Sequence, residues 1–245
     1  MPLSSASPKS ALRISTVHGL PDVLRDLGQD TSKVLDDLGF EQKLFDHADN
    51  RITLAERGRL LEGCAKASGC PHFGLLVGQK DGLEQLGIVG LLARHAPDVG
   101  TALQRLIRHF HIHAQGVEIG LAIDGGSALF SYAISDDGVE GIDQAGDGAV
   151  AAQLNIMREL CGPDFKALAA WFVRSPPNIL GPYNNFFRVR LRFDAPIHGL
   201  EFSSSWLTRR LPRTDEALAH LIAEKISALE IQKGGDLSEN VRRLM

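Results

Sequence analysis

The sequence predicts an α+β fold, in which a helical N-terminal part is followed by an antiparallel or mixed sheet with crossing helices. Apolar residues recur at helical spacing through much of residues 20–110. Residues 117–134 then contain two runs of alternating apolar and polar side chains around a glycine-containing turn, a pattern typical of a β-hairpin. Further helical and strand patterns follow between residues 150 and 212. Helices and strands segregated along the chain in this way favour an α+β arrangement.

Three short helices are expected in the N-terminal part. The first carries a stripe of leucine and valine side chains and ends at Gly28, and the second, capped by Asp30, ends at Gly39. Thr53 and Glu56 have the spacing of a capping box, so the third helix begins there.

A helix is expected over residues 98–110, because its apolar side chains keep helical spacing without a break. A hairpin follows, with strands over residues 117–123 and 128–134. The acidic, glycine-containing segment 136–147 lacks the alternating ligand spacing of a calcium loop and is expected to be a solvated, mobile connection. A helix over 150–161 comes next.

The last part of the sheet is expected between residues 170 and 202. A strand breaks at Pro176-Pro177, and an aromatic-rich short helix covers residues 181–187. The next strand buries Val189, Leu191 and Phe193. Its alternating residues, Arg188, Arg190 and Arg192, are expected on the outer sheet face, where charge discourages pairing with other chains or could hold an anion.

A C-terminal helix is expected over residues 214–231. Its apolar stripe consists of Leu218, Leu221, Ile222, Ile226 and Leu229. Gly234-Gly235 is expected to break this helix, and residues 237–245 restart a helical pattern that stops midway.

Composition excludes several classes of protein. A net charge of -4 gives no general attraction for nucleic acid. Three cysteines without a Cys-x-x-Cys pair, namely Cys64, Cys70 and Cys161, predict reduced, buried thiols and a cytoplasmic location. No apolar run approaches the ~20 residues of a membrane span, so no membrane association is expected. Motifs for nucleophilic, nucleotide-dependent or zinc-dependent catalysis are absent from the sequence, which predicts no catalytic residues and no cofactor.

Several features occur in a fixed order: a proline-containing segment, the aromatic stretch Tyr183 to Phe187, the strand that contains Phe193, and the ending Leu211-Pro212. In this order they resemble the N-terminal, arabinose-binding-like regulatory domain of AraC-type transcriptional regulators. The resemblance extends to residues 51–54 and 87–110 and spans most of residues 20–231.

The resemblance implies a division of the chain. Residues 1–19 are expected to be a disordered lead-in, and residues 20–231 an effector-binding and dimerisation domain. Its parts are a helical part over 20–110, a sheet-containing part over 111–212 and a linker helix over 214–231. Residues 232–245 resemble a linker and the start of a DNA-binding domain with two helix-turn-helix units. We expect that this chain is a shortened form lacking that domain, or a product that ends early.

The function predicted in this way is ligand sensing and dimerisation in a bacterial transcriptional regulator, which contacts DNA only through the missing domain. A small-molecule effector is expected in an apolar cavity between the helical part and the sheet. The candidate lining residues are Phe110, Phe130, Tyr132, Trp171 and Phe202, each of which could equally be core. The candidates for a homodimer contact are Leu218, Leu221, Ile222 and Leu229.

Two other interpretations remain open from the sequence. His109, His111 and His113 alternate beyond the helix 98–110 and could share one face as metal ligands or acid-base groups of a stand-alone α+β enzyme. They could equally interact with the end of the helix, and no Cys, Asp or Glu nearby completes a ligand set, so no metal site is predicted. A dimerisation module that binds no ligand is the other alternative.

Overall fold

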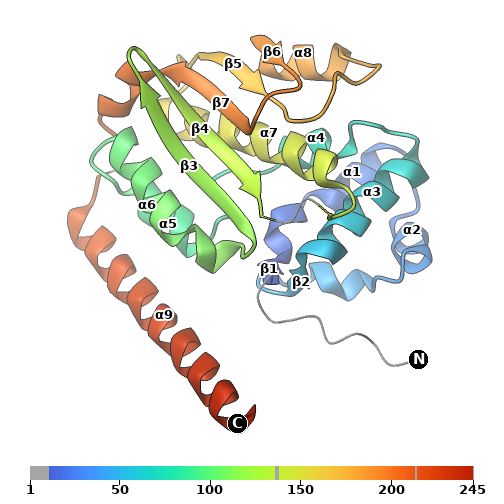
Figure 1. Cartoon of the computed structure of the whole chain (residues 1–245), viewed down its shortest axis with the longest axis horizontal. Helices are drawn as coiled ribbons and strands as arrows, with labels where there is room; N and C mark the ends of the chain where they lie inside the picture. Colours follow the sequence, from blue (N-terminus) through green and yellow to red (C-terminus); the bar gives the residue numbers. More distant parts are fainter. Residues whose placement is uncertain (1–10, 136–137, 213, 245) are drawn as a thin grey trace.

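The computed structural model of the chain describes residues 11–135, 138–212 and 214–244, with only the helical backbone described from residue 231 onward. The predicted α+β class is confirmed: helices gather in the N-terminal part, and a five-stranded sheet is built from the second half of the chain (Figure 1).

A two-stranded sheet opens the structure, and it corrects the expected disordered lead-in. β1 (Ala11–Arg13) pairs antiparallel with β2 (Arg51–Thr53), and a 3-10 turn follows over Ile14–Val17. Leu12 and Ile14 are fully buried. Residues 11–19 are therefore ordered by burial of apolar side chains. Their apolar pattern is too short to be recognised after a stretch of small and polar residues. Residues 1–10 lie outside the described residues.

The three predicted N-terminal helices are present as α1 (Leu20–Asp26), α2 (Thr31–Asp37) and α3 (Leu54–Ser68). Asp30 caps α2 by accepting a hydrogen bond from the Lys33 backbone N–H. Both hydrogen bonds of the predicted capping box, between Thr53 and Glu56, are formed at the start of α3. Two further short helices, α4 (Phe73–Gly78) and α5 (Ile88–Arg94), complete this part.

The main sheet has the strand order β3-β4-β7-β5-β6. The predicted hairpin forms β3 (Val117–Asp124) and β4 (Ser127–Ile134), and β7 (His198–Ser203) pairs antiparallel with both β4 and β5 (Ala167–Trp171). Only β6 (Arg190–Arg192) pairs in parallel, with β5, so the sheet is mixed. The parallel pair requires a crossover, which the chain makes through α8 (Gly181–Phe187).

Arg188 does not join the outer row of arginines that the alternation predicted. It ends α8 in the left-handed conformation, with φ of 55°. Arg190 is exposed, whereas the Arg192 guanidinium stacks 4.8 Å above the Trp171 ring. The strand alternation therefore starts later than expected, because the helix end takes up the first arginine.

Two long helices cover the inner side of the sheet. α6 (Val99–His113) lies beside β3, and α7 (Ile142–Cys161) crosses behind the sheet and reaches the N-terminal helices (Figure 1). α6 is longer than the predicted helix by its final turn. α7 also begins earlier than predicted, so the segment expected to be mobile through residue 147 is helical from Ile142. Residues 136 and 137 lie outside the described residues.

α7 holds the short helix α4 in place at both ends. The Gln144 side chain accepts a hydrogen bond from the Gly74 N–H at 2.7 Å, and the Asn155 amide donates to the Gln79 carbonyl at 3.0 Å. The two helices also approach so closely that a Cβ on Gly74 would lie 2.0 Å from the Gln144 carbonyl oxygen. Side chains larger than glycine are therefore excluded from this contact.

The C-terminal helix α9 (Glu216–Leu244) corrects two expectations. It continues through Gly234-Gly235, because glycine in a helix costs only ~1 kcal/mol per residue. Ile222 is buried at 6% exposure in the protein's own core, beside α5, so it is not available to a partner chain.

Asp147 forms a buried polar contact between α7 and the segment after β5. Its carboxylate accepts hydrogen bonds from the Tyr183 hydroxyl at 2.5 Å and from Arg174 Nη1 at 2.9 Å, and it is fully buried. Burial raises the pKa of Asp147 to about 6, although Arg174 and Tyr183 act in the opposite direction. This acidic residue is therefore part of the core and not of a solvated connection.

We predict that Asp147 makes the fold less stable as the pH rises from about 4 to about 7. A carboxyl group with a raised pKa in the folded state contributes stability below its unfolded pKa, and that contribution is lost as the pH rises through the folded value. Relative to Asp147→Asn, the wild type should lose up to about 3 kcal/mol of unfolding free energy over this range. Urea denaturation at several pH values measures the difference.

Asp143→Asn, which removes a half-exposed carboxylate 3.9 Å from Arg174, is the matched control. A wild type that gains stability relative to Asp147→Asn would show that the Arg174 ion pair outweighs burial.

Candidate functional site

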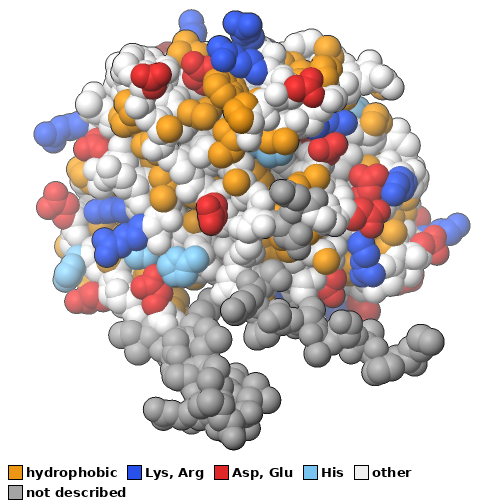
Figure 2. Space-filling model, in the orientation of Figure 1, with side chains coloured by type: hydrophobic (Ala, Val, Ile, Leu, Met, Phe, Trp, Pro, Cys, Tyr) orange, Lys and Arg blue, Asp and Glu red, His pale blue; other side chains and the backbone are white. Residues whose placement is uncertain are grey.

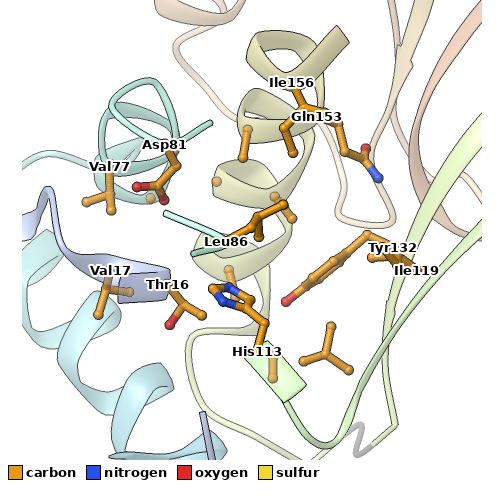
Figure 3. Close-up of a pocket in the computed structure, with 18 of the residues that line it drawn as sticks. Thr16, Val17, Val77, Asp81, Leu86, His113, Ile119, Tyr132, Gln153 and Ile156 are labelled. Carbon is orange, nitrogen blue, oxygen red and sulfur yellow. The ribbon is translucent and has the colours of Figure 1, made fainter. Parts of the chain in front are cut away.

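A cavity of about 90 Å³ lies at the junction between the helical part and the sheet (Figure 3). We call it the junction cavity. Its walls come from α3, α4, α6, α7, β3, β4 and the turn after β1. The apolar part of the wall consists of Val17, Leu61, Val77, Leu86, Leu106, Phe110, Val117, Ile119, Phe130 and Ile156, with small residues of α7 between them. This volume exceeds the ~15 Å³ that one water molecule requires.

Local periodicity brings these side chains to the cavity. Phe130 and Tyr132 are two residues apart on β4 and therefore face the same side of the sheet. Leu106, Phe110 and His113 recur at helical spacing on one face of α6. The facing side of α7 carries Ala145, Gly148, Ala149 and Ala152, whose small side chains leave the space open.

Polar groups without partners point to a binding function. Within the described residues, neither atom of the Gln153 side-chain amide has a hydrogen-bond partner, and the same is true of His113 Nδ1, Arg57 Nε and Asp81 Oδ1. Gln153, His113 and Arg57 are each less than 10% exposed. A buried polar group without a partner costs roughly 1–3 kcal/mol, so native proteins seldom keep several in one place.

The electrostatics of the wall follow from burial. Burial lowers the pKa of His113 to about 3, and the positive charges of Arg13, Arg57 and Arg51 add to the effect, so the imidazole is neutral near pH 7. Burial also raises the pKa of Asp81 well above its ordinary value, which favours the uncharged acid. Arg57 contributes a guanidinium group, the one basic Arg or Lys side chain of the described wall.

The five aromatic residues proposed as a ligand site divide into two groups. Phe110, Phe130 and Tyr132 line the junction cavity, and their contact with a ligand stays a prediction. Phe202 does not line it, because it is fully buried on the same sheet farther along, packed against Phe165. Trp171 also lies elsewhere. Its indole N–H donates to Glu201 at 3.0 Å, under the guanidinium of Arg192.

The three histidines do not form the cluster that the enzyme alternative requires. They lie in the last turns of α6. His113 faces the junction cavity, whereas His109 and His111 each lie 3.2 Å from the Glu230 carboxylate of α9. No group of three or more potential metal ligands occurs within the described part of the chain.

The polar residues of the cavity were missed by sequence reasoning, although a signal was present. Arg57 stands in the apolar stripe of α3, three residues after Leu54 and four before Leu61. Gln153 likewise stands between Val150 and Met157 on the buried side of α7. A charged or amide side chain at a core position of a helical stripe is the available signal.

The face of the outer surface that Figure 2 shows carries no broad patch of a single kind of side chain. There acidic, basic and hydrophobic side chains are interspersed, without a broad area of one charge. Among the described residues, no helix is long and apolar enough to cross a membrane. The three cysteines are free and buried, as expected. An α+β fold with a largely apolar cavity and a few convergent polar groups is typical of small-molecule-binding domains.

Comparison with known proteins identifies the family. Residues 28–211 match the arabinose-binding domain of AraC transcription regulators, an N-terminal domain. The chain therefore belongs to this family.

Its relatives are transcriptional regulators. The chain is 23% identical over 236 residues to the ornithine utilization regulator of Pseudomonas aeruginosa, covering 95% of this chain and 69% of that protein. It is 24% identical over 242 residues to the HTH-type transcriptional regulator VirS of Mycobacterium tuberculosis, covering 96% and 71%. The solved structure of the transcriptional regulator CdpR from Pseudomonas aeruginosa shares the fold, with a TM-score of 0.57 at 15% identity over 82% of this chain and 58% of that one. The family and these relatives are regulators and not enzymes, which overturns the enzyme alternative based on the three histidines.

We predict that two neighbouring alanines of α7 respond differently to enlargement. Ala152 lines the junction cavity, so Ala152→Phe should fill open space and change the free energy of unfolding by less than about 1 kcal/mol. Ala151 is fully buried in the packed core, so Ala151→Phe should cost about 3 kcal/mol or prevent folding. Urea denaturation measures both. Equal losses in the two variants would contradict a cavity at this place.

Proposed function

We propose that this chain is the effector-sensing and dimerising part of an AraC-type transcriptional regulator. In the full protein it would control DNA binding by helix-turn-helix units that follow α9, in the cytoplasm. The observation that carries the proposal is the junction cavity, with its unpartnered polar groups, inside a domain of this family. The name of VirS as an HTH-type regulator, and the fact that this chain covers 71% of it, support a DNA-binding domain in the remainder.

The contacts of α6 support coupling between the cavity and α9. Phe110 and His113 of its last turns line the junction cavity, and His109 and His111 of the same turns meet Glu230. A ligand that preferred one placement of this end of α6 would therefore act directly on the helix that leads toward the DNA-binding units. Such a preference between two arrangements is what allosteric control requires.

Exposed leucines support a dimer contact beside α5 and α9. Leu218 and Leu221 of α9 are 36% and 61% exposed, and Leu91 of the neighbouring helix α5 is 41% exposed. Leu229 is half-buried. Large exposed apolar side chains on adjacent helices are characteristic of interaction surfaces. We therefore keep Leu218, Leu221 and Leu229 as contact candidates and replace Ile222 by Leu91.

A ligand screen tests the sensing function. We expect at least one compound from a collection of amino acids, carboxylic acids and sugars to raise the Tm of the chain, because ligands that bind only the folded state stabilise it. The same compound should leave the Tm of Ala152→Phe unchanged, since that variant fills the cavity. If every stabilising compound acts equally on Ala152→Phe, or none stabilises the wild type, the junction cavity is not the sensing site and a dimerisation module without a ligand there is favoured.

A double substitution tests the dimer contact. Leu218→Lys with Leu221→Lys should convert the chain to a monomer with unchanged circular dichroism, because like charges would meet across a two-fold interface. The control, His220→Lys with Ser227→Lys, places two lysines at exposed positions on the opposite side of α9 and should remain dimeric. Light scattering coupled to size-exclusion chromatography measures the mass. A Leu218→Lys, Leu221→Lys variant that stays dimeric would move the contact away from α9.

A further inference from the structure

In the described part of the chain, Arg57 is a buried cation without a counter-ion. Its residue exposure is 6%, and among the described residues no carboxylate lies within ion-pair distance of it. Its one hydrogen bond in that part of the chain runs from Nη2 to the Tyr132 hydroxyl at 2.8 Å, and Nε has no partner. Removing a guanidinium from water without an opposing charge costs several kcal/mol, so an anion at this place would relieve a large penalty.

The surroundings of Arg57 offer further hydrogen-bond donors to an anion. Tyr132 accepts from Arg57, and its own O–H proton has no acceptor among the described residues. Figure 3 shows the Tyr132 hydroxyl pointing toward the ring of His113, with Thr16 beside them. His113 Nδ1 also has no partner in the part of the chain that the structure describes, and a neutral imidazole presents one N–H donor.

Other charged groups nearby leave this end of the cavity positive. Arg13 is paired with Asp49 at 2.8 Å on the protein surface, and Arg51 is exposed. Asp81 is the acidic residue of the described cavity wall, burial raises its pKa, and no ion pair joins it to Arg57 among the described residues. The remaining wall is mainly apolar, with Phe110, Ile119 and Leu86 among its members.

We propose, on the basis of the proposed sensing function, that the effector is a monocarboxylate with an apolar aliphatic or aromatic body, whose carboxylate binds Arg57 and the Tyr132 hydroxyl. The guanidinium matches a carboxylate with two parallel N–H donors, and the hydroxyl adds a third. The apolar body then occupies the space beside the small residues of α7. Carboxylate binding completes the hydrogen bonds of a site whose polar atoms otherwise lack partners.

The experiment measures binding of matched ligands to the full 245-residue chain by calorimetry and thermal shift. The ligands are n-butanoate, n-octanoate and benzoate, each compared with the alcohol and the amine of the same carbon skeleton. We expect at least one carboxylate to bind roughly tenfold or more tightly than its alcohol, a difference of about 1.4 kcal/mol. Its amine should bind no better than the alcohol.

Variants assign the effect to Arg57. Arg57→Met should fold, because it keeps the apolar stem of the side chain, and should weaken carboxylate binding by roughly tenfold while leaving alcohol binding unchanged. Arg57→Lys should recover part of the affinity, and Tyr132→Phe should lose part of it. Arg59→Met on the same helix is the control, since Arg59 is exposed and lies over Phe40 outside the cavity. Its carboxylate affinity should equal that of the wild type.

Two results would overturn the inference. One is an amine or alcohol that binds the wild type as tightly as the carboxylate and no longer binds the Ala152→Phe variant. The sensing function would then stand with a different ligand chemistry, and for the amine Asp81 would be the partner. The other is carboxylate binding that Arg57→Met and Arg59→Met weaken equally, or no carboxylate binding at all. The broader screen with Ala152→Phe decides separately whether the cavity binds any ligand.

Discussion

The close contact between α4 and α7 joins the helical part of the molecule to the sheet. α4 has six residues, and helices shorter than ~12 residues are marginal in isolation. Two amide side chains of α7, Gln144 and Asn155, satisfy backbone groups at its two ends. Glycines permit the two backbones to touch, because a Cβ on Gly78 would lie 2.1 Å from the Gly148 carbonyl oxygen. α7 thereby joins the N-terminal helices to the sheet that it crosses.

The junction cavity follows from this joining. The residues of α7 that permit close packing are small, and where they face the sheet instead of α4 they leave space unfilled. Packed cores are normally filled to crystal density, and unpartnered polar groups are normally rare. The described wall of this cavity has both open space and atoms of Arg57, Gln153 and His113 without partners among the described residues. Both features lower the stability of the fold, and a bound ligand would remove both costs.

α6 connects this site with the C-terminal helix. One side of its last turns faces the cavity through Phe110 and His113, and the other meets Glu230. Ile222 and Ile226 anchor the first half of α9 in the core next to α5, which itself packs against α6. The proposed ligand site, the proposed dimer contact and the proposed route toward DNA therefore lie on adjacent helices. Because α6 contacts both the cavity and α9, a small displacement of α6 at the cavity would act directly on α9.

The class of fold, the three N-terminal helices with the caps of α2 and α3, the hairpin and the apolar stripe of α9 could be predicted from the sequence, because periodicity and caps are local properties. The tertiary structure decided what each buried side chain meets. Asp147 was predicted to be in solvent and lies in the core, because α7 starts earlier than its apolar pattern and Arg174 and Tyr183 come from distant segments. Phe130 and Phe202 have the same strand signal, yet only Phe130 reaches the cavity. Arg57 can be recognised as a candidate anion-binding residue only in the folded chain, where no carboxylate among the described residues lies beside it. Such relations depend on contacts between residues far apart in the chain, which local pattern does not encode.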